Sequence, residues 1–429
     1  MQFEQLDERL VRCVAPNGLR VLAEQLPGVR STAIGIWVRS GSAHEVPTQM
    51  GTAHLLEHLV FKGSERRTAR EIAWELESRG GSLDAYTSRD HTNFQAHILD
   101  TDLPVAVDVL TDLVRRPLLT EDDLRMEKNV VLEEIRGVED NPEELVHDLH
   151  ARTLWGSHPY GHAILGSRDT VTALTAADLR DFHTSRYVPQ NCVIAAAGSI
   201  TTEALVSHLE AEGWFDAAGG EKAHPLPHAL QDARRGVRES VHRGGQQHHI
   251  VFGTDTVPAS DSRRYALGLI VTLFGGGMSS RLFQKVREEL GLAYAVYAYQ
   301  QFYQAAGVLG VYVGTQPETA DLAVSAILTE YERLAEEGIP EAELITAKQQ
   351  LKGQIVLSLE SPGSRMGRLA GMELTGDRYR RIDEVLAEID AVTGDSVREI
   401  AREFLAPDRQ TVLRLGPTDH HRTYEETRT

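Results

Sequence analysis

Residues 51–63 read Gly-Thr-Ala-His-Leu-Leu-Glu-His-Leu-Val-Phe-Lys-Gly, and the rest of the chain is interpreted outward from this stretch. On a helix, positions i, i+3 and i+4 share one face, so His54, Glu57 and His58 project together. Two His residues at this spacing can bind one zinc ion, and the Glu between them can then activate a water molecule. The alternative is an ordinary amphipathic helix that contains two His residues by chance.

The order His-x-x-Glu-His is the reverse of the commoner His-Glu-x-x-His and is typical of the inverzincin type. A catalytic zinc ion takes three protein ligands and keeps a fourth position open, so a third ligand must lie elsewhere in the chain.

Residues 121–139 form a second predicted helix with two acidic residues on its apolar side. On a helical wheel, Glu127 and Glu134 fall in the apolar stripe, which also contains Val130, Val131, Ile135 and Val138. Buried carboxylates are costly unless they are paired or bound to metal, so both are candidates for the metal site. Glu133 points with the polar residues and is excluded. The alternative is a frayed helix on which both glutamates reach solvent.

Further motifs extend over most of the chain. They are Gly80-Gly81-Ser-Leu-Asp84-Ala85-Tyr86-Thr87, His158-Pro159-Tyr160-Gly161 with Ile164-Leu165-Gly166, Arg186-Tyr187 with Asn191, Gly275-Gly276-Gly277, and the segment from Arg287 to Tyr294. With residues 51–63, these motifs resemble the pitrilysin and mitochondrial processing peptidase family of zinc metallopeptidases. The resemblance covers roughly residues 10 to 416.

The resemblance implies a role for each candidate of the metal site. It implies that His54, His58 and Glu134 are the zinc ligands, with one Zn²⁺ per chain, and that Glu57 is the general base. Glu127 is expected to orient a ligand His through the free ring N–H. A buried ion-pair partner is the alternative for Glu127.

The resemblance also places Arg287 and Tyr294 at the active site, where both can donate hydrogen bonds to the substrate. By themselves, these residues would be interpreted as a surface Arg and a core Tyr. A chain of this length has only one half with zinc ligands, so the pair is expected to come from another subunit. The resemblance therefore implies a homodimer with an active site shared between subunits.

The segment Asp84, Ala85, Tyr86 and Thr87 resembles the edge strand that binds substrate as an added strand. Many relatives carry Asn at the position of Asp84. In this chain a carboxylate, which only accepts hydrogen bonds, therefore replaces an amide that can also donate them.

The function implied is that of a zinc metalloendopeptidase acting on extended or unfolded peptides inside a closed chamber. The alternative is a non-catalytic or partner-dependent subunit of a heterodimer like the processing peptidases. Intact His54, Glu57, His58 and Glu134 favour the first function, because inert members usually lose one or more of these residues.

The predicted fold class is α+β, with two homologous halves that each form an antiparallel-rich sheet with helices packed on one face. The predicted domains are a catalytic zinc-binding domain (1–216), a linker (217–235), an inert homologous domain that contributes Arg287 and Tyr294 (236–416), and a polar tail (417–429). A faint repeat supports the two halves. Aligning Phe61 with Phe274 places Leu267, Ile270 and Val271 at the positions of His54, Glu57 and His58.

Composition excludes several classes of partner. The net charge is −19, which disfavours binding to nucleic acid and to anionic membranes. No apolar run reaches the ~18 residues that a membrane span needs. The acidic N-terminus predicts no secretory signal, and Cys13 and Cys192 have no metal-binding spacing. A cytoplasmic protein is therefore expected.

Other suggestive residues are interpreted as structural. His147, His150, His248, His249, His420 and His421 have no matching carboxylate or lie in the tail, so they are expected to be structural or surface residues. The Gly275–Gly277 run lacks the Lys and Ser/Thr of a phosphate-binding loop and predicts a turn between helices.

Overall fold

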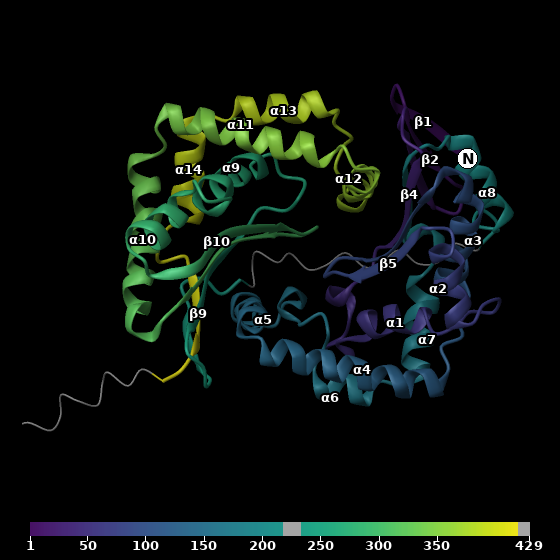
Figure 1. Cartoon of the computed structure of the whole chain (residues 1–429), viewed down its shortest axis with the longest axis horizontal. Helices are drawn as coiled ribbons and strands as arrows, with labels where there is room; N and C mark the ends of the chain where they lie inside the picture. Colours follow the sequence, from purple (N-terminus) through teal and green to yellow (C-terminus); the bar gives the residue numbers. More distant parts are fainter. Residues whose placement is uncertain (218–232, 419–429) are drawn as a thin grey trace, which may run out of the picture. The chain divides into compact units, whose positions relative to one another are not determined.

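Two β-sheets organise the chain, each covered by helices (Figure 1). The computed structural model describes residues 1–217 and 233–418, so most of the predicted linker 217–235 and of the predicted tail 417–429, including His420 and His421, lies outside the described residues. The described residues divide into two compact units. The first comprises the described parts of Met1–Arg136, His162–Leu226 and Ile355–Arg381, and the second those of Gly137–Gly161, Pro227–Gln354 and Ile382–Thr429.

The first sheet has the strand order β1-β2-β3-β7-β4-β6-β5. Its strands are β1 (Gln2–Asp7), β2 (Leu10–Val14), β3 (Arg20–Gln25), β4 (Ser31–Val38), β5 (Ser82–Thr87), β6 (Thr92–Leu99) and β7 (Cys192–Gly198). Neighbouring strands are antiparallel except for the parallel pair β3 and β7. The strands predicted near residues 21, 33–38 and 92–98 are confirmed.

Helices and short 3-10 turns surround this sheet. The helices are α1 (Thr52–Val60), α2 (Ala69–Glu77), α3 (Leu103–Arg115), α4 (Glu121–Asp140), α6 (Arg168–Ala173), α7 (Ala176–Arg186), α8 (Thr202–Ala211) and α12 (Pro362–Thr375). The 3-10 turns are Ser42–His44, Pro47–Gln49, Asp100–Asp102 and Pro189–Asn191. Helix α2 begins with the predicted capping box, in which Thr68 and Glu71 each bond the backbone N–H of the other. Past its end, Gly80 has a φ of +79°, which favours glycine.

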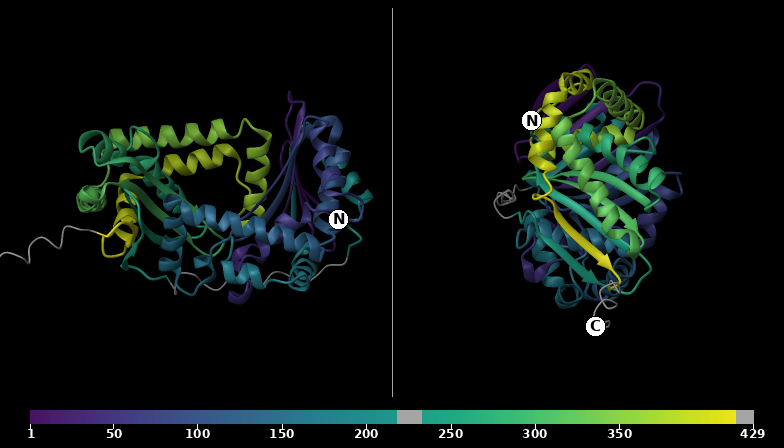
Figure 2. Two further views of the ribbon diagram at one scale, coloured as in Figure 1. Left: turned by 60° about the horizontal axis from the view of Figure 1, so that its bottom comes forward. Right: turned by 90° about the vertical axis from the view of Figure 1, so that its left-hand side faces the viewer.

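The second sheet has the strand order β10-β11-β9-β12-β8. Its strands are β8 (Arg238–His242), β9 (His248–Thr256), β10 (Ala293–Phe302), β11 (Gly307–Thr315) and β12 (Thr411–Gly416). Only β12 and β8 are parallel among the described strand pairs of this sheet. In the right-hand view of Figure 2, the yellow strand is β12, which joins the sheet from the far end of the sequence. Both sheets are thus antiparallel-rich, as predicted.

The helices of the second unit are α5 (Pro142–Trp155), α9 (Arg264–Gly275), α10 (Ala320–Glu337), α11 (Glu341–Ser358), α13 (Ile382–Ala391) and α14 (Gly394–Phe404). A π-helical segment (Phe283–Glu289) and 3-10 turns at Pro159–Gly161 and Pro317–Thr319 complete it. Residues 276–280 form the turn predicted between helices. Helix α9 buries Leu267 and Ile270 in the core of the second unit, and the homology of the two halves stays a prediction.

One helix also covers the second face of each sheet, whereas the sequence predicted helices on one face only. Helix α12 packs its Leu369 against a cluster that includes Trp37 and Val193, and α5 packs Val146 against Val251 and Leu413. The physical reason is that strands such as β7 are buried at every position, so both of their faces need a cover. The predicted boundaries place α5 in the first domain and α12 in the second, whereas α5 lies in the second compact unit and α12 in the first, so the compact units cross the predicted domain boundaries.

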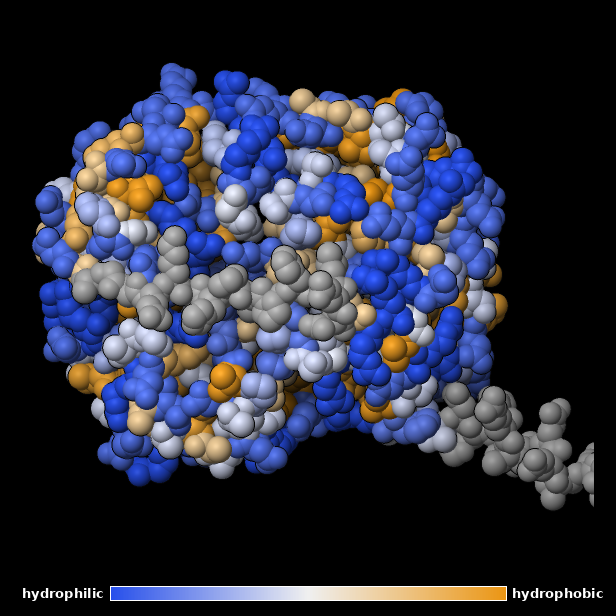
Figure 3. All heavy atoms as spheres, turned by 180° about the vertical axis from the view of Figure 1, so that it is seen from behind, coloured by the Kyte–Doolittle hydropathy of each residue, from blue (hydrophilic) through white to orange (hydrophobic). Residues whose placement is uncertain are grey.

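The face of the molecule that Figure 3 shows is mostly hydrophilic. On the face shown in Figure 3, hydrophobic residues are scattered among hydrophilic ones. Among the described helices, none combines the length and the apolar character that crossing a bilayer requires.

Candidate metal centre

Helix α1 carries three of the predicted site residues, and a buried carboxylate caps its start. The helix has no acidic residue in its first turn. Instead, Glu45 accepts hydrogen bonds from the backbone N–H of Gly51 at 2.8 Å and of Ala53 at 2.6 Å. These donors have no partner within the helix, so Glu45 satisfies them.

The predicted apolar face of α1 is in the core. Leu55, Leu56, Leu59 and Val60 are fully buried in the main cluster of the first unit. Gly51 has a φ of +92°, and a Cβ there would lie 2.6 Å from the carbonyl oxygen of Leu165. The helix is therefore packed closely along its apolar face and at its N-terminus, which fixes the orientation of the face that carries the histidines.

His54, His58 and Glu134 converge. Glu134 Oε2 lies 3.7 Å from His54 Nε2 and 3.7 Å from His58 Nε2, and one ligand atom from each of the three residues lies within 4.8 Å of the other two. Ligand atoms at about 2 Å from a tetrahedral zinc ion lie about 3.3 Å apart, so the spacing fits one ion. Two His and one carboxylate is also a donor set of catalytic zinc sites. Among residues 1–217 and 233–418, no other group of three such side chains has this geometry.

Burial favours the metal-binding form of His54. Its surroundings lower the pKa of His54 to about 3, first through burial and then through the nearby His58. The imidazole is therefore neutral near pH 7 and keeps a lone pair for a metal.

Glu134 differs from the helical-wheel prediction. The buried stripe of α4 consists of Leu124, Glu127, Val131 and Ile135, whereas Val130 is exposed and the Glu134 side chain is 42% exposed. A wheel shows which residues share a face but not which face the core covers. Glu133, which the wheel excluded, pairs with Arg136 at the surface.

Glu127 lies behind the histidine pair. Its carboxylate Oε2 is 3.2 Å from His58 Nδ1, the ring nitrogen that does not face Glu134. Its Oε1 is 2.7 Å from Lys62 Nζ, and the side chain is only 6% exposed. Glu127 is thus in contact with a ligand candidate and with a cation at once. The sequence analysis did not identify Lys62. Two signals could have found it: a buried carboxylate such as Glu127 needs a positively charged partner, and Lys62 lies four residues after His58, a spacing that places two residues on the same side of a helix.

Glu57 lies beside the three converging residues and is linked to β5. It accepts a hydrogen bond of 2.5 Å from the Thr87 hydroxyl. Burial raises the pKa of Glu57 above its ordinary value; the Thr87 hydrogen bond and His58 oppose this rise, while Glu134 and Asp84 add to it. A carboxylate with a raised pKa accepts a proton more readily, which suits a general base.

Strand β5 is the last strand of the first sheet. Asp84 and Tyr86 point to the exposed side, Ala85 is half-buried, and the Tyr86 hydroxyl accepts a 3.3 Å hydrogen bond from Trp37 Nε1. In the described part of the chain, no strand pairs with the outer edge of β5. An extended peptide could add there by backbone hydrogen bonds.

Arg287 and Tyr294 are brought together in the second unit. Arg287 lies in the last turn of the π-helical segment, Gly291 has a φ of +61°, and Tyr294 is the second residue of β10. Arg287 Nη1 donates to the Tyr294 carbonyl at 3.1 Å, and its guanidinium lies 4.7 Å from the Phe283 ring and 4.6 Å from the Tyr294 ring. The Tyr294 side chain is 79% exposed rather than in the core. π-helical segments are frequent at functional sites.

Two further histidines have structural contacts, as expected. His150 is buried and bonds the Thr411 carbonyl at 3.1 Å, and His147 lies 3.1 Å from the Tyr297 hydroxyl.

Comparison with known proteins defines the class. Residues 20–168 match the model "Insulinase (Peptidase family M16)", and residues 173–351 match "Peptidase M16 inactive domain". The chain is 40% identical to an uncharacterized zinc protease of Streptomyces coelicolor, over 95% of this chain and 89% of that protein. It is 36% identical to the uncharacterized zinc protease YmxG of Bacillus subtilis, over 94% and 97%. The chain therefore belongs to peptidase family M16, which confirms the resemblance seen in the sequence.

Solved structures confirm the fold class. A protease from Helicobacter pylori matches with a TM-score of 0.88 at 22% identity, covering 95% of this chain and 99% of that one. A peptidase M16 inactive domain from Pseudomonas fluorescens matches with a TM-score of 0.87 at 22% identity, covering 95% and 98%.

Proposed function

We propose that this chain is a zinc-dependent metalloendopeptidase that hydrolyses peptide bonds in extended or unfolded peptides. The observation that carries the proposal is the convergence of His54, His58 and Glu134, with Glu57 beside them. These three residues would hold one zinc ion per chain. When bound, zinc supplies a Lewis acid that polarises a carbonyl or a water molecule.

The chain's own residues would carry the proton transfers. Glu57 accepts a proton from the water whose oxygen forms a bond to the carbonyl carbon of the substrate. It then delivers this proton to the amide nitrogen as the carbon–nitrogen bond breaks. Thr87 holds the Glu57 carboxylate in place through their 2.5 Å hydrogen bond. Because Thr87 ends β5, a peptide added to that edge would run past Glu57.

The test replaces Glu57 by Gln. Because Glu57 is not proposed as a ligand, Glu57→Gln should keep one zinc per chain and lose about 10²–10⁴ in the rate of cleaving a quenched peptide. Zinc content by atomic spectrometry and cleavage by fluorescence are measured on the same preparations. Near-normal turnover by a zinc-replete variant would remove Glu57 from this role. A wild-type chain that holds zinc and cleaves no member of a peptide library would favour a non-catalytic or partner-dependent subunit.

We also propose that two copies of the chain share their active sites in a closed chamber. Arg287 is held between two aromatic rings and Tyr294 is largely exposed, so both can donate to a group outside their own unit. Such donors stabilise the negative oxygen that develops during peptide hydrolysis. A two-fold homodimer would supply the pair to each zinc site.

Mixing two inactive variants tests the shared site. Glu57→Gln and the double variant Arg287→Ala/Tyr294→Ala should each be inactive, and their mixture should regain part of the activity. One of the two sites in a mixed dimer would then have every group intact. A mixture that stays inactive after proven subunit exchange contradicts the model, as does an active preparation with a mass near the 47.5 kDa of one chain.

We further propose a cytoplasmic location. Cys13 and Cys192 are both free and buried, which suits a reducing compartment. Recovery of the protein outside the cytoplasmic fraction of its host would contradict this location.

A further inference from the structure

Lys62 is the charged residue that follows α1, and it links the end of this helix to α4. Its ammonium lies 2.7 Å from Glu127 Oε1, and Glu127 Oε2 lies 3.2 Å from His58 Nδ1. Lys62, Glu127 and His58 therefore form one continuous row of contacts that ends at a ligand candidate.

Each oxygen of the Glu127 carboxylate has a separate partner in this row. A carboxylate only accepts, so His58 Nδ1 carries the hydrogen, and the lone pair of His58 lies on Nε2, which faces Glu134 at 3.7 Å. The Glu127 side chain is 6% exposed, so little water can replace a lost partner. Without the ammonium, the carboxylate could turn about its last bond, and the His58 ring would lose its fixed acceptor.

The backbone around Lys62 is held firmly. Its N–H bonds the Leu59 carbonyl at 3.0 Å, and Gly63 pairs with Thr68 in a short antiparallel bridge. The Ser64 N–H bonds the Arg67 carbonyl at 2.8 Å. The backbone that carries the Lys62 ammonium is therefore held by hydrogen bonds on both sides of this residue.

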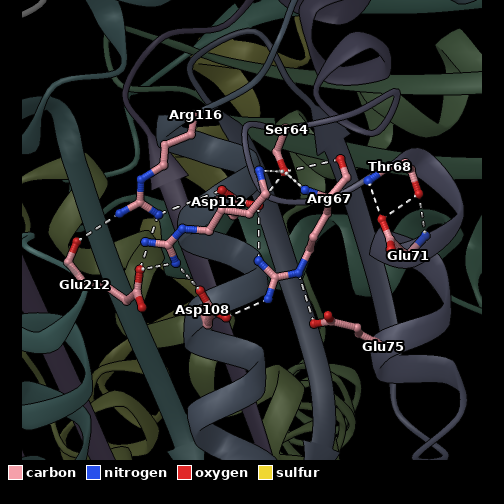
Figure 4. Close-up of polar contacts among 10 residues, drawn as sticks. Ser64, Arg67, Thr68, Glu71, Glu75, Asp108, Asp112, Arg116 and Glu212 are labelled. Atoms are coloured by element: carbon pink, nitrogen blue, oxygen red, sulfur yellow. Dashed lines mark hydrogen bonds and ion pairs between the residues drawn. The ribbon is translucent and has the colours of Figure 1, made fainter.

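A partly buried ion network anchors the loop that carries Lys62 (Figure 4). The Arg67 side chain, 9% exposed, binds Glu75 at 3.0 Å, Asp108 at 2.5 Å and Asp112 at 3.1 Å, and Asp112 also accepts from the Ser64 hydroxyl. Asp112 is on α3 and is completely buried. The loop that carries Lys62 is thus fixed to the core of the first unit.

We propose that Lys62 is a positioning residue of the metal centre: by holding the Glu127 carboxylate, it orients the His58 imidazole toward the metal. The inference rests on the proposed function, since it takes His54, His58 and Glu134 as the zinc ligands.

The test is a double-mutant cycle on zinc affinity, measured by competition with a chromophoric chelator on the full chain at one pH. Replacing groups that orient metal ligands typically weakens metal binding 10–100-fold. Lys62→Met, and Lys62→Gln as a second neutral variant, should weaken zinc binding about tenfold, and Lys62→Arg should restore most of the loss. Because Lys62 acts through Glu127, Lys62→Met should cause no further loss in a Glu127→Gln background.

Lys128→Met is the matched control. Lys128 is next to Glu127 in sequence, but its ammonium bonds the Thr172 carbonyl at 2.8 Å, so this variant removes the same charge without touching the row. Its zinc affinity should equal that of the wild type. Wild-type affinity in Lys62→Met and Lys62→Gln, or losses that multiply in the double variant, would overturn the inference alone. A wild-type chain that binds no zinc would overturn the proposed function as well.

Discussion

At the scale of single residues, neighbouring glutamates of α4 have different surroundings. Glu134 points to the two histidines of α1, whereas Glu133 pairs with Arg136 at the surface. Adjacent helical residues point about 100° apart, so a shift of one residue decides which carboxylate reaches the two histidines.

Glutamine variants separate the two residues. Glu134→Gln should lower the zinc content of the purified chain, because it removes the charge of a proposed ligand, while Glu133→Gln should leave it at one zinc per chain. Both variants remove one negative charge from the same helix, so Glu133→Gln is the matched control. Zinc loss in the Glu133 variant with retention in the Glu134 variant would reverse the assignment.

At the scale of elements, α1 depends on a cap that comes from the segment before the helix and not from its first turn. Glu45 binds the first backbone N–H groups of the helix from a buried position. Burial raises the pKa of Glu45 to about 8, although its two backbone hydrogen bonds act in the opposite direction. The cap should therefore make the stability of the first unit depend on pH.

The direction in which stability changes with pH follows from the raised pKa of Glu45. The folded chain binds the Glu45 proton more tightly than the unfolded chain, so this contribution is fully present below about pH 4.5 and is lost as the pH rises to about 8. Each unit of pKa difference corresponds to about 1.4 kcal/mol. In urea unfolding between pH 5 and pH 8.5, the wild type should lose stability relative to Glu45→Gln, which cannot titrate.

Glu65→Gln is the control for this series, because Glu65 is exposed on the loop after α1. Its unfolding midpoints should follow those of the wild type at every pH. Parallel profiles for the wild type and Glu45→Gln would show that the cap does not titrate in this range.

At the scale of the whole molecule, the charge of −19 should act on substrates. Asp84 is exposed on the edge strand, and its charge and that of Glu134 both act on Glu57. Peptides with Arg or Lys near the cleaved bond should therefore be preferred, and the preference should weaken with salt if it reflects long-range attraction.

Cleavage of matched basic and neutral peptides at low and high salt checks this preference. The kcat/KM of the basic peptide should fall several-fold with salt, while that of the neutral peptide changes little. Asp84→Asn should reduce the difference between the two peptides. A cleavage profile dominated by acidic residues would rule the preference out.

The sequence by itself determined the features that depend on a few neighbouring residues. The face shared by His54, Glu57 and His58, the capping box of Thr68 and Glu71, and the strand and helix periods follow from local backbone geometry, which repeats in every protein. Local patterns did not distinguish Glu134 from Glu127 as the third metal ligand. The resemblance to known peptidases singled out Glu134.

Only the tertiary structure decided which distant groups meet. It showed that Glu134 is half-exposed beside the histidines and Glu127 buried behind them, that Glu45 caps α1, and that Lys62 reaches Glu127. It also showed that α5 and α12 cover the second faces of the sheets. A sequence period states which residues share a face, but what covers that face depends on the packing of elements far apart in the chain.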